Sequence, residues 1–183
     1  ALRWADVDFE RATIRFERSM QRIPGAGVVF APPKTKRSRR IIRVGDNCIE
    51  LLREYRQIQR EQRLRMGSAW VRTVDICGKT IKNDLIFTRA DGAPFDPHSI
   101  TSWFSKFLKA NDLTSAHFHS LRHSNATLLI ADHVPVSAVS GRLGHANIST
   151  TLNIYTSAIQ SADAAAASSL ESTFERIKEK NHA

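Results

Sequence analysis

The sequence predicts an α+β fold, a mainly helical domain with a small three-stranded antiparallel sheet on one side. Short segments of alternating apolar and polar residues occur within the first 44 residues, whereas most of the later chain has apolar residues at helical spacing between helix caps. The composition, 42% hydrophobic and 25% charged, is that of an average folded protein. We therefore expect residues 1–183 to bury one core and form a single domain.

Three short strands are expected near the N-terminus, each bounded by turn-forming residues. Apolar and polar side chains alternate in residues 13–20, and the other two strands are residues 27–31 and 41–44. Pro32-Pro33 ends the second strand, so a loop joins it to the third.

A long amphipathic helix is expected from Asp46 or Asn47, either of which can cap it, to Met66. One face carries apolar side chains, and another carries four arginines: Arg53, Arg56, Arg60 and Arg63. This arginine stripe is compatible with contact to a phosphate backbone, but a solvated charged face is the favoured interpretation. Residues 67–83 are expected to form an irregular connection to the apolar run at 85–87.

The second half of the chain has the signals of shorter helices. Asp96 and Pro97 supply an N-cap and a first helical residue for a helix to about Ala110. Aromatic side chains are expected to form its buried face: Trp103, Phe104 and Phe107.

Further helices are expected over about 119–131 and 136–143, the second ending at Gly144 as its C′ residue. Another is capped by Ser149 and runs through Tyr155. A final amphipathic helix over about 168–179 would dock on a neighbouring protomer or pack on its own domain.

Positive charge is concentrated in the first half of the chain. Residues 1–91 hold 20 of the 27 Lys and Arg and 11 of the 18 Asp and Glu, so the whole net charge of +9 lies there. Six basic residues cluster without an acid among them: Lys34, Lys36, Arg37, Arg39, Arg40 and Arg43. A polyanion such as nucleic acid is a natural partner, since neutralised phosphates release counterions, and a solvated hairpin is the alternative.

The sequence has no targeting signal for a membrane. No run approaches the roughly 20 apolar residues of a membrane span, and the N-terminus lacks the apolar stretch of a signal peptide. Cys48 and Cys77 have no CxxC spacing, which fits a reducing compartment. We expect a cytoplasmic protein without a membrane partner.

Three motifs follow one another within 37 residues: His119-Ser-Leu-Arg122-His123, Leu143-Gly144-His145 and Ser149-Thr-Thr-Leu-Asn-Ile-Tyr155. His119 and Arg122 are three residues apart, so they share one face of a helix. A fixed cation beside an imidazole supplies the charge neutralisation and the proton carrier that phosphate transfer needs. Each residue alone is more often structural, and the set carries the prediction.

Together these motifs resemble the catalytic domain of the tyrosine recombinase (phage integrase) family, which has a His-x-x-Arg box, a Leu-Gly-His box and a tyrosine shortly afterwards. Pro33-Lys34-Thr35-Lys36 resembles the family's β-hairpin turn with its catalytic lysine. Leu2-Arg3-Trp4-Ala5-Asp6-Val7-Asp8 resembles the segment after its first active-site arginine. Over about residues 1–160, the resemblance implies the DNA breaking-rejoining fold. It also implies site-specific recombination that integrates or excises a bacterial mobile element or prophage.

The resemblance also implies a role for each matched residue. Tyr155 would attack a DNA phosphodiester, forming a 3′-phosphotyrosyl link and releasing a 5′-hydroxyl. Arg122 would bind the nonbridging oxygens and His145 would hydrogen-bond the phosphoryl group. Lys34 would protonate the leaving oxygen, and His119 would act in proton transfer. A phenol with a pKa of about 10 needs such help at neutral pH, but no metal or other cofactor is implied.

The implied partner is double-stranded DNA, gripped by its phosphates rather than by base edges. Candidate phosphate contacts lie in the basic cluster: Lys36, Arg37, Arg39 and Arg40. The full-length protein is expected to self-associate on DNA as a synaptic tetramer. The sequence identifies neither the DNA site nor accessory proteins.

The family has a further active-site arginine immediately before the segment matched by Leu2-Arg3-Trp4, and a core-binding domain before that. The sequence begins at Ala1, so we expect a fragment that lacks both and is catalytically impaired. Loss of one cationic donor typically costs about 10²- to 10³-fold in rate. Thr156 and Ser157 follow the tyrosine, where many relatives have a histidine.

Other protein classes make different demands on these residues. A zinc enzyme could use His119, His123 and His145, but a serine stands where HExxH requires Glu, and Arg122 would place its charge beside the metal. A serine hydrolase would need a Gly-x-Ser-x-Gly turn. A non-enzymatic basic DNA-binding regulator is the main alternative, and it would keep its activity in a Tyr155→Phe variant. Type IB topoisomerases and enzymes that resolve hairpin ends share the recombinase chemistry.

Overall fold

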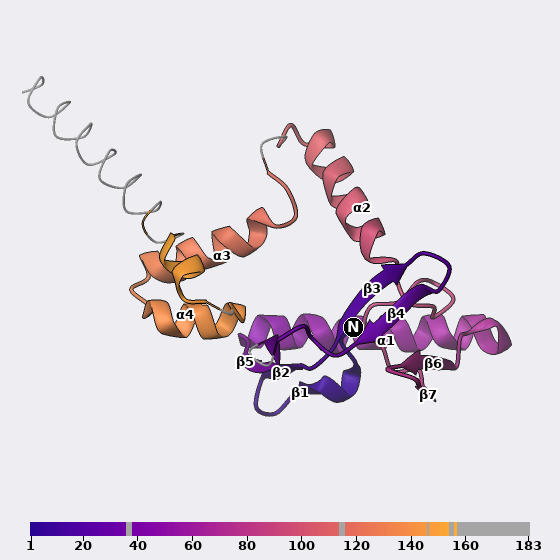
Figure 1. Ribbon diagram of the computed structural model, residues 1–183. Coiled ribbons are helices and arrows are strands. Elements are labelled where there is room, and N and C mark those ends of the chain that lie inside the picture. The colour runs from indigo at the N-terminus through magenta and orange to yellow at the C-terminus, as the bar shows by residue number, and fades with distance from the viewer. Residues whose placement is uncertain (36–37, 114–115, 146, 154–155, 157–183) are drawn as a thin grey trace, which may run out of the picture. The chain divides into compact units, whose positions relative to one another are not determined.

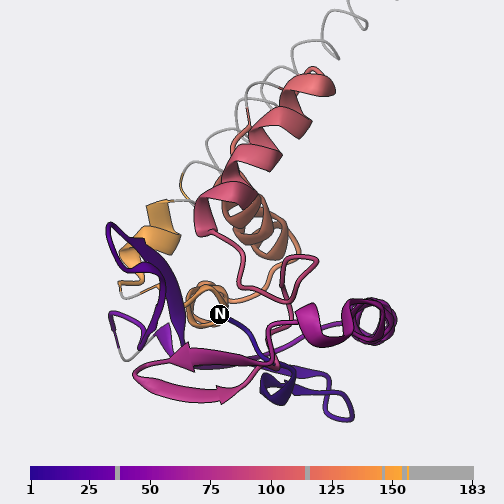
Figure 2. The same cartoon turned by 90° about the vertical axis from the view of Figure 1, so that its right-hand side faces the viewer.

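The computed structural model describes residues 1–35, 38–113, 116–145, 147–153 and 156 of the chain. They fall into two compact units, residues 1–118 and the described residues from 119 onward, each with its own apolar core (Figures 1 and 2). Small antiparallel sheets lie in the first unit, and helices occur in both. The predicted α+β class is confirmed.

A three-stranded antiparallel sheet forms near the N-terminus from β1 (Val7–Asp8), β2 (Thr13–Phe16) and β5 (Arg40–Arg43), with β2 in the middle. Its register pairs Ile14 with Ile42. Ile14 packs in a core that includes Trp4, Val7, Ile49 and Ile86. The sheet therefore has the predicted three strands. However, one of them is residues 7–8, and the predicted strand 27–31 is not part of this sheet.

The remaining N-terminal strands form a separate hairpin of β3 (Ser19–Ile23) and β4 (Gly27–Ala31) (Figure 1). The segment 13–20 that was expected to be one strand is thus divided between two sheets. Gly25 and Gly27, with φ of 77° and 74°, provide the left-handed conformations of the hairpin turn.

A third antiparallel pair, β6 (Thr73–Ile76) and β7 (Lys79–Lys82), occupies the segment predicted to be irregular, so that prediction is wrong. Cys77 and Gly78 join the strands, both with positive φ (54° and 74°), as a two-residue hairpin turn requires. Val74 and Ile76 are buried with Phe30 and Leu85 in a second core cluster.

Helix α1 (Asp46–Met66) has the predicted extent, and Figure 2 looks nearly along its axis. Its N-cap position is occupied by Gly45 rather than by either predicted residue. The buried Gln59 holds it to the rest of the unit: Oε1 accepts from Trp4 Nε1 at 2.7 Å, and Nε2 donates to Leu85 O at 3.1 Å and Ile86 O at 2.8 Å. One polar side chain therefore fixes the helix against two distant segments.

Helix α2 (Pro97–Ala110) begins as predicted, with Asp96 Oδ1 accepting from His98 N at 2.9 Å. Its aromatic residues are not the buried face that was expected, since Trp103 is 62% and Phe107 45% exposed. Instead, their rings stack on one another with centroids 5.6 Å apart, because residues four apart on a helix are neighbours.

The second unit contains α3 (Ser120–Ala131) and α4 (Val136–Leu143), close to their predicted bounds. Ala126 and Ile130 of α3 pack against Val139 and Leu143 of α4. Residues 149–153 and 156 are helical, whereas the predicted helix 168–179 lies outside the described residues. Among the described helices, none is long and apolar enough to span a bilayer.

Candidate active site

Arg122 lies in the first turn of α3, and its guanidinium reaches the last residue of α4 and the turn that follows it. One terminal nitrogen donates to Leu143 O at 2.6 Å, and Nε donates to His145 Nε2 at 3.2 Å. Burial lowers the pKa of the guanidinium, but arginine keeps its charge at neutral pH. A fixed cation is thus held beside an imidazole.

The turn that carries His145 depends on Gly144, the C-terminal cap of α4, whose φ of 71° is left-handed. Its N–H donates to Ser140 O at 2.9 Å, and His145 N donates to the same carbonyl at 3.1 Å. Glycine takes this conformation without the steric cost of a Cβ. The turn thus brings the imidazole back to Arg122.

Thr151 holds the other nitrogen of the His145 ring. Its Oγ1 lies 2.7 Å from Nδ1, and the threonine is fully buried. The Arg122 Nε–H can only donate, so Nε2 of His145 acts as the acceptor and carries no proton. In the neutral ring the proton is then on Nδ1, which donates to Thr151 Oγ1.

His119 occupies the N-cap position of α3 and is exposed. Its ring packs edge-on against His123, with centroids 5.0 Å apart, and its carbonyl accepts from Arg122 N at 3.1 Å. As the N-cap of α3, His119 therefore belongs to the same compact unit as Arg122 and His145. Within the described residues, no three His, Cys, Asp or Glu side chains are grouped so that they could hold a metal ion.

Lys34 belongs to the first unit, where it is exposed in the loop between β4 and β5. Ser38 N donates to Thr35 O at 3.1 Å, and the two hydroxyls lie 2.8 Å apart, which closes the loop. Arg39 is exposed nearby. The Arg40 guanidinium lies 4.6 Å from the Phe16 ring centroid, a cation–π contact.

Three predicted residues lie outside the described part of the chain: Tyr155, Lys36 and Arg37. The structure thus brings together Arg122 and His145, whereas the joint placement of Lys34, the histidines and Tyr155 around one phosphate stays a prediction. Sequence reasoning missed a function for Thr151, although this residue lies within one of the motifs. The helical phase that buries Thr151 and exposes Thr150 is the signal that separates the two threonines.

Residues 1–161 match the model of the phage integrase family. A XerC-like tyrosine recombinase of Caldanaerobacter subterraneus is 32% identical over 94% of this chain and 44% of its own length. The ICEBs1 integrase of Bacillus subtilis is 28% identical over 85% of the chain and 39% of its own length. The chain therefore spans less than half the length of these relatives.

Solved structures show the same fold. The Tn1549 transposon integrase in complex with transposon right end DNA matches with a TM-score of 0.70 and 22% identity, over 84% of this chain and 47% of that one. The XerA recombinase matches with a TM-score of 0.59 and 23% identity, over 88% of this chain and 48% of that one. These matches extend across both compact units.

Proposed function

This chain belongs to the phage integrase family, and from that premise we propose that it is the catalytic part of a tyrosine-type site-specific DNA recombinase. Tyr155 acts as the nucleophile on a DNA phosphodiester, and the 3′-phosphotyrosyl ester preserves the bond energy until a 5′-hydroxyl attacks it. Covalent intermediates of this kind divide one difficult displacement into two easier ones.

The hydrogen bond between Arg122 and His145 is the observation that best supports this proposal. The two groups are bonded directly to each other, so an entering phosphate finds a charge and a polar ring already positioned. On phosphate binding, the guanidinium exchanges its bond to His145 for bonds to the nonbridging oxygens. His145 then donates to the phosphoryl group, Lys34 protonates the leaving oxygen, and His119 takes part in proton transfer.

Double-stranded DNA is the proposed substrate, with Arg39 of the β4–β5 loop and Arg40, the first residue of β5, among its phosphate contacts. The structure of the Tn1549 transposon integrase was solved with transposon DNA, which supports this assignment. We include self-association of the whole protein on DNA in the proposal, because exchange of strands between two duplexes needs more than one nucleophile. The site of action is then the cytoplasm, where bacterial DNA lies.

The decisive experiment incubates the whole protein with a nicked suicide duplex, from which the cleaved end diffuses away. A covalent protein–DNA adduct should accumulate, and peptide mapping should place the DNA on Tyr155. Tyr155→Phe should bind DNA but form no adduct, and Arg122→Gln should slow adduct formation by about 10²- to 10³-fold. An adduct on another residue would contradict the role of Tyr155.

The same experiment distinguishes a basic DNA-binding regulator from an enzyme. A regulator binds the duplex without forming an adduct, and its Tyr155→Phe variant behaves as the natural protein does. If the natural protein forms no adduct with its own recombination site, the recombinase proposal fails and the regulator takes its place.

A further inference from the structure

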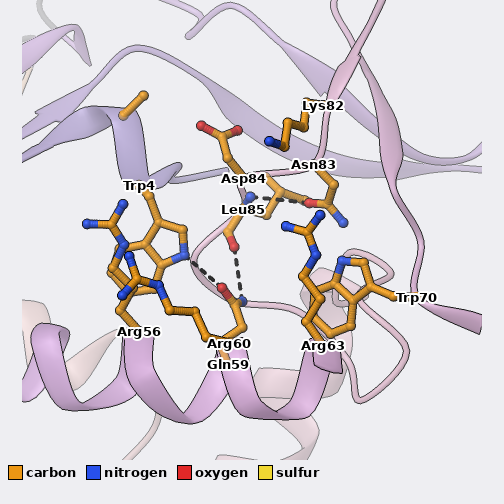
Figure 3. Close-up of a pocket in the computed structure, with 11 residues that line it drawn as sticks. Trp4, Arg56, Gln59, Arg60, Arg63, Trp70, Lys82, Asn83, Asp84 and Leu85 are labelled. Carbon is orange, nitrogen blue, oxygen red and sulfur yellow. Dashed lines mark hydrogen bonds between the residues drawn. The ribbon is translucent and has the colours of Figure 1, made fainter. Parts of the chain in front are cut away.

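The first unit contains a basic cavity of about 460 Å³ that is distinct from the candidate active site (Figure 3). It lies between one face of α1 and residues 82–85, and Trp4 and Ala5 also line it. Four cationic side chains line it: Arg56, Arg60, Arg63 and Lys82. The indoles of Trp4 and Trp70 form part of its walls (Figure 3).

The carboxylate of Asp84, in the lining of this cavity, does not balance the positive charge of the four cationic side chains. Asp84 lines the cavity, but its Oδ1 already accepts from Arg3 Nε at 2.5 Å. Among the described residues, no carboxylate lies within ion-pair distance of Arg60, Arg63 or Lys82. Like charges that share a cavity repel one another, so this arrangement favours an anion between them.

Trp70 provides a second and independent observation. Its side chain is only 5% exposed, and its Nε1 is buried with no hydrogen-bond partner among the described residues. In contrast, Trp4 Nε1 donates to Gln59 at 2.7 Å. Buried N–H groups are nearly always paired, so an unpaired one indicates a missing acceptor.

The Trp70 ring is held with this N–H on the cavity side (Figure 3). A Cβ on Gly92 would lie 2.5 Å from Trp70 Cε2, so glycine at this position allows the backbone to pack directly on the indole. An acceptor inside the cavity would therefore meet an indole that is already fixed in place.

We propose that this cavity binds a phosphate group, with Arg60, Arg63 and Lys82 as its cations and Trp70 Nε1–H as a neutral donor. A phosphate monoester brings nearly two negative charges and three acceptor oxygens, which suit several cations better than the single charge of a carboxylate. Guanidinium groups match phosphate oxygens with two parallel N–H bonds. Two sources of phosphate suit the site: a small phosphate monoester, and a DNA backbone, whose diesters carry one charge each but follow one another along the strand. The site is independent of the recombination chemistry.

The test follows the indole N–H of Trp70 by NMR in protein labelled with ¹⁵N-tryptophan, with Trp70→Phe to assign the resonance. Inorganic phosphate is titrated at constant ionic strength, with chloride as the balancing ion. The Trp70 resonance should shift downfield and saturate, because its N–H gains an acceptor. The Trp103 resonance serves as the reference, because this residue belongs to α2 and lies outside the cavity lining.

Charge variants decide whether the cavity is responsible. Arg63→Gln and Arg60→Gln should each weaken phosphate binding by about 10-fold, as loss of one charged hydrogen bond predicts. Arg65→Gln is the matched control on the same helix: Arg65 is 82% exposed, lies outside the cavity lining and should leave binding unchanged.

A short duplex of arbitrary sequence, added in a second arm, identifies the source. If the duplex shifts the Trp70 resonance and phosphate competes with it, the site contacts a DNA backbone; a response to phosphate alone identifies a small ligand. The proposal is overturned if neither probe shifts Trp70, or if Arg65→Gln weakens binding as much as Arg63→Gln does.

Discussion

Thr151 Oγ1 lies 2.7 Å from His145 Nδ1, on the side of the ring opposite the Arg122 guanidinium. A hydroxyl both accepts and donates, so it can satisfy Nδ1 in either protonation state. Without DNA it accepts from Nδ1–H. If His145 donates Nε2–H to a phosphate, as we propose, the same hydroxyl turns and donates to Nδ1. We infer that Thr151 is a positioning residue that allows His145 to change its tautomer without moving.

Replacing Thr151 with Val keeps the shape of this buried residue but removes the hydroxyl. We expect the rate of adduct formation on the suicide duplex to fall by about 10-fold, the equivalent of one hydrogen bond. Thr151→Ser should restore most of the rate. The exposed neighbour Thr150→Val is the matched control and should react normally.

A positioning role affects the reaction rather than the binding of DNA. Without the hydroxyl, Nδ1 loses its partner in either protonation state, so Thr151→Val should slow adduct formation while the affinity for the duplex stays that of the natural protein. A matching loss of affinity, together with an equal loss of rate in Thr151→Ser, would reduce Thr151 to a packing residue.

Replacing Gly144 or Gly141 with alanine should change the free energy of unfolding in opposite directions. Gly144 has a φ of 71°, so Gly144→Ala should lower the free energy of unfolding by about 1 kcal/mol. It should also slow adduct formation, because the turn carries His145. Gly141 is helical and a Cβ there meets nothing within 4 Å, so Gly141→Ala should raise the stability by about 0.5–1 kcal/mol. Urea denaturation of both variants tests these signs, and a stabilised Gly144→Ala would contradict the first.

These contrasts show which parts of the candidate site the sequence could predict. The Arg122 and His145 motifs were identified by their resemblance to the family's boxes, and the Gly144 cap is a local helix-end signal. The role of Thr151 depends on which of two adjacent threonines faces inward, and this is decided by packing of the second unit. The bond from Arg122 to Leu143 O joins two helices and has no local signal.

Arg39 tests the proposed DNA contact of the basic loop, because it is exposed and removing its charge should leave the fold intact. If it neutralises one phosphate, Arg39→Gln should reduce the slope of log K against log salt concentration by about 0.9. Arg65→Gln removes the same charge from α1 and should leave the slope unchanged. An unchanged slope in Arg39→Gln would exclude a phosphate contact at this residue.

Gln59 connects α1 to Trp4 and to residues 85–88 through four hydrogen bonds. Gln59→Met would leave a buried indole N–H and buried carbonyls without this partner, so we expect a loss of about 1–3 kcal/mol of stability. Gln57→Met is the control on the same helix, since Gln57 is exposed and bonds only Glu61 among the described residues. Equal denaturation midpoints in the two variants would contradict this account.

The fold was predictable where a signal lies within one element, as at Asp96-Pro97. It was not predictable where residues distant in the sequence decide the outcome. Nothing near Gln59 indicates its bonds to residues 4 and 85–88, and Cys77 is an unusual residue for a hairpin turn, so β6–β7 was missed. The aromatic residues of α2 matched the pattern of a buried face, but in the described residues they pack chiefly on one another and on Phe118.

Asp96 gives the chain a predicted pH dependence in the acid range. The N–H of His98 and then the Arg22 guanidinium hold the pKa of this carboxyl below its usual value. A lowered pKa in the folded state means that the stabilisation is fully present above the unfolded pKa of about 3.9 and is lost as the pH falls through the folded value. Asp96→Asn keeps an acceptor for the helix cap but does not titrate, so its stability should fall less steeply below about pH 4. Urea denaturation across that range measures the difference, and parallel curves for the two proteins would show that Asp96 contributes nothing to acid unfolding.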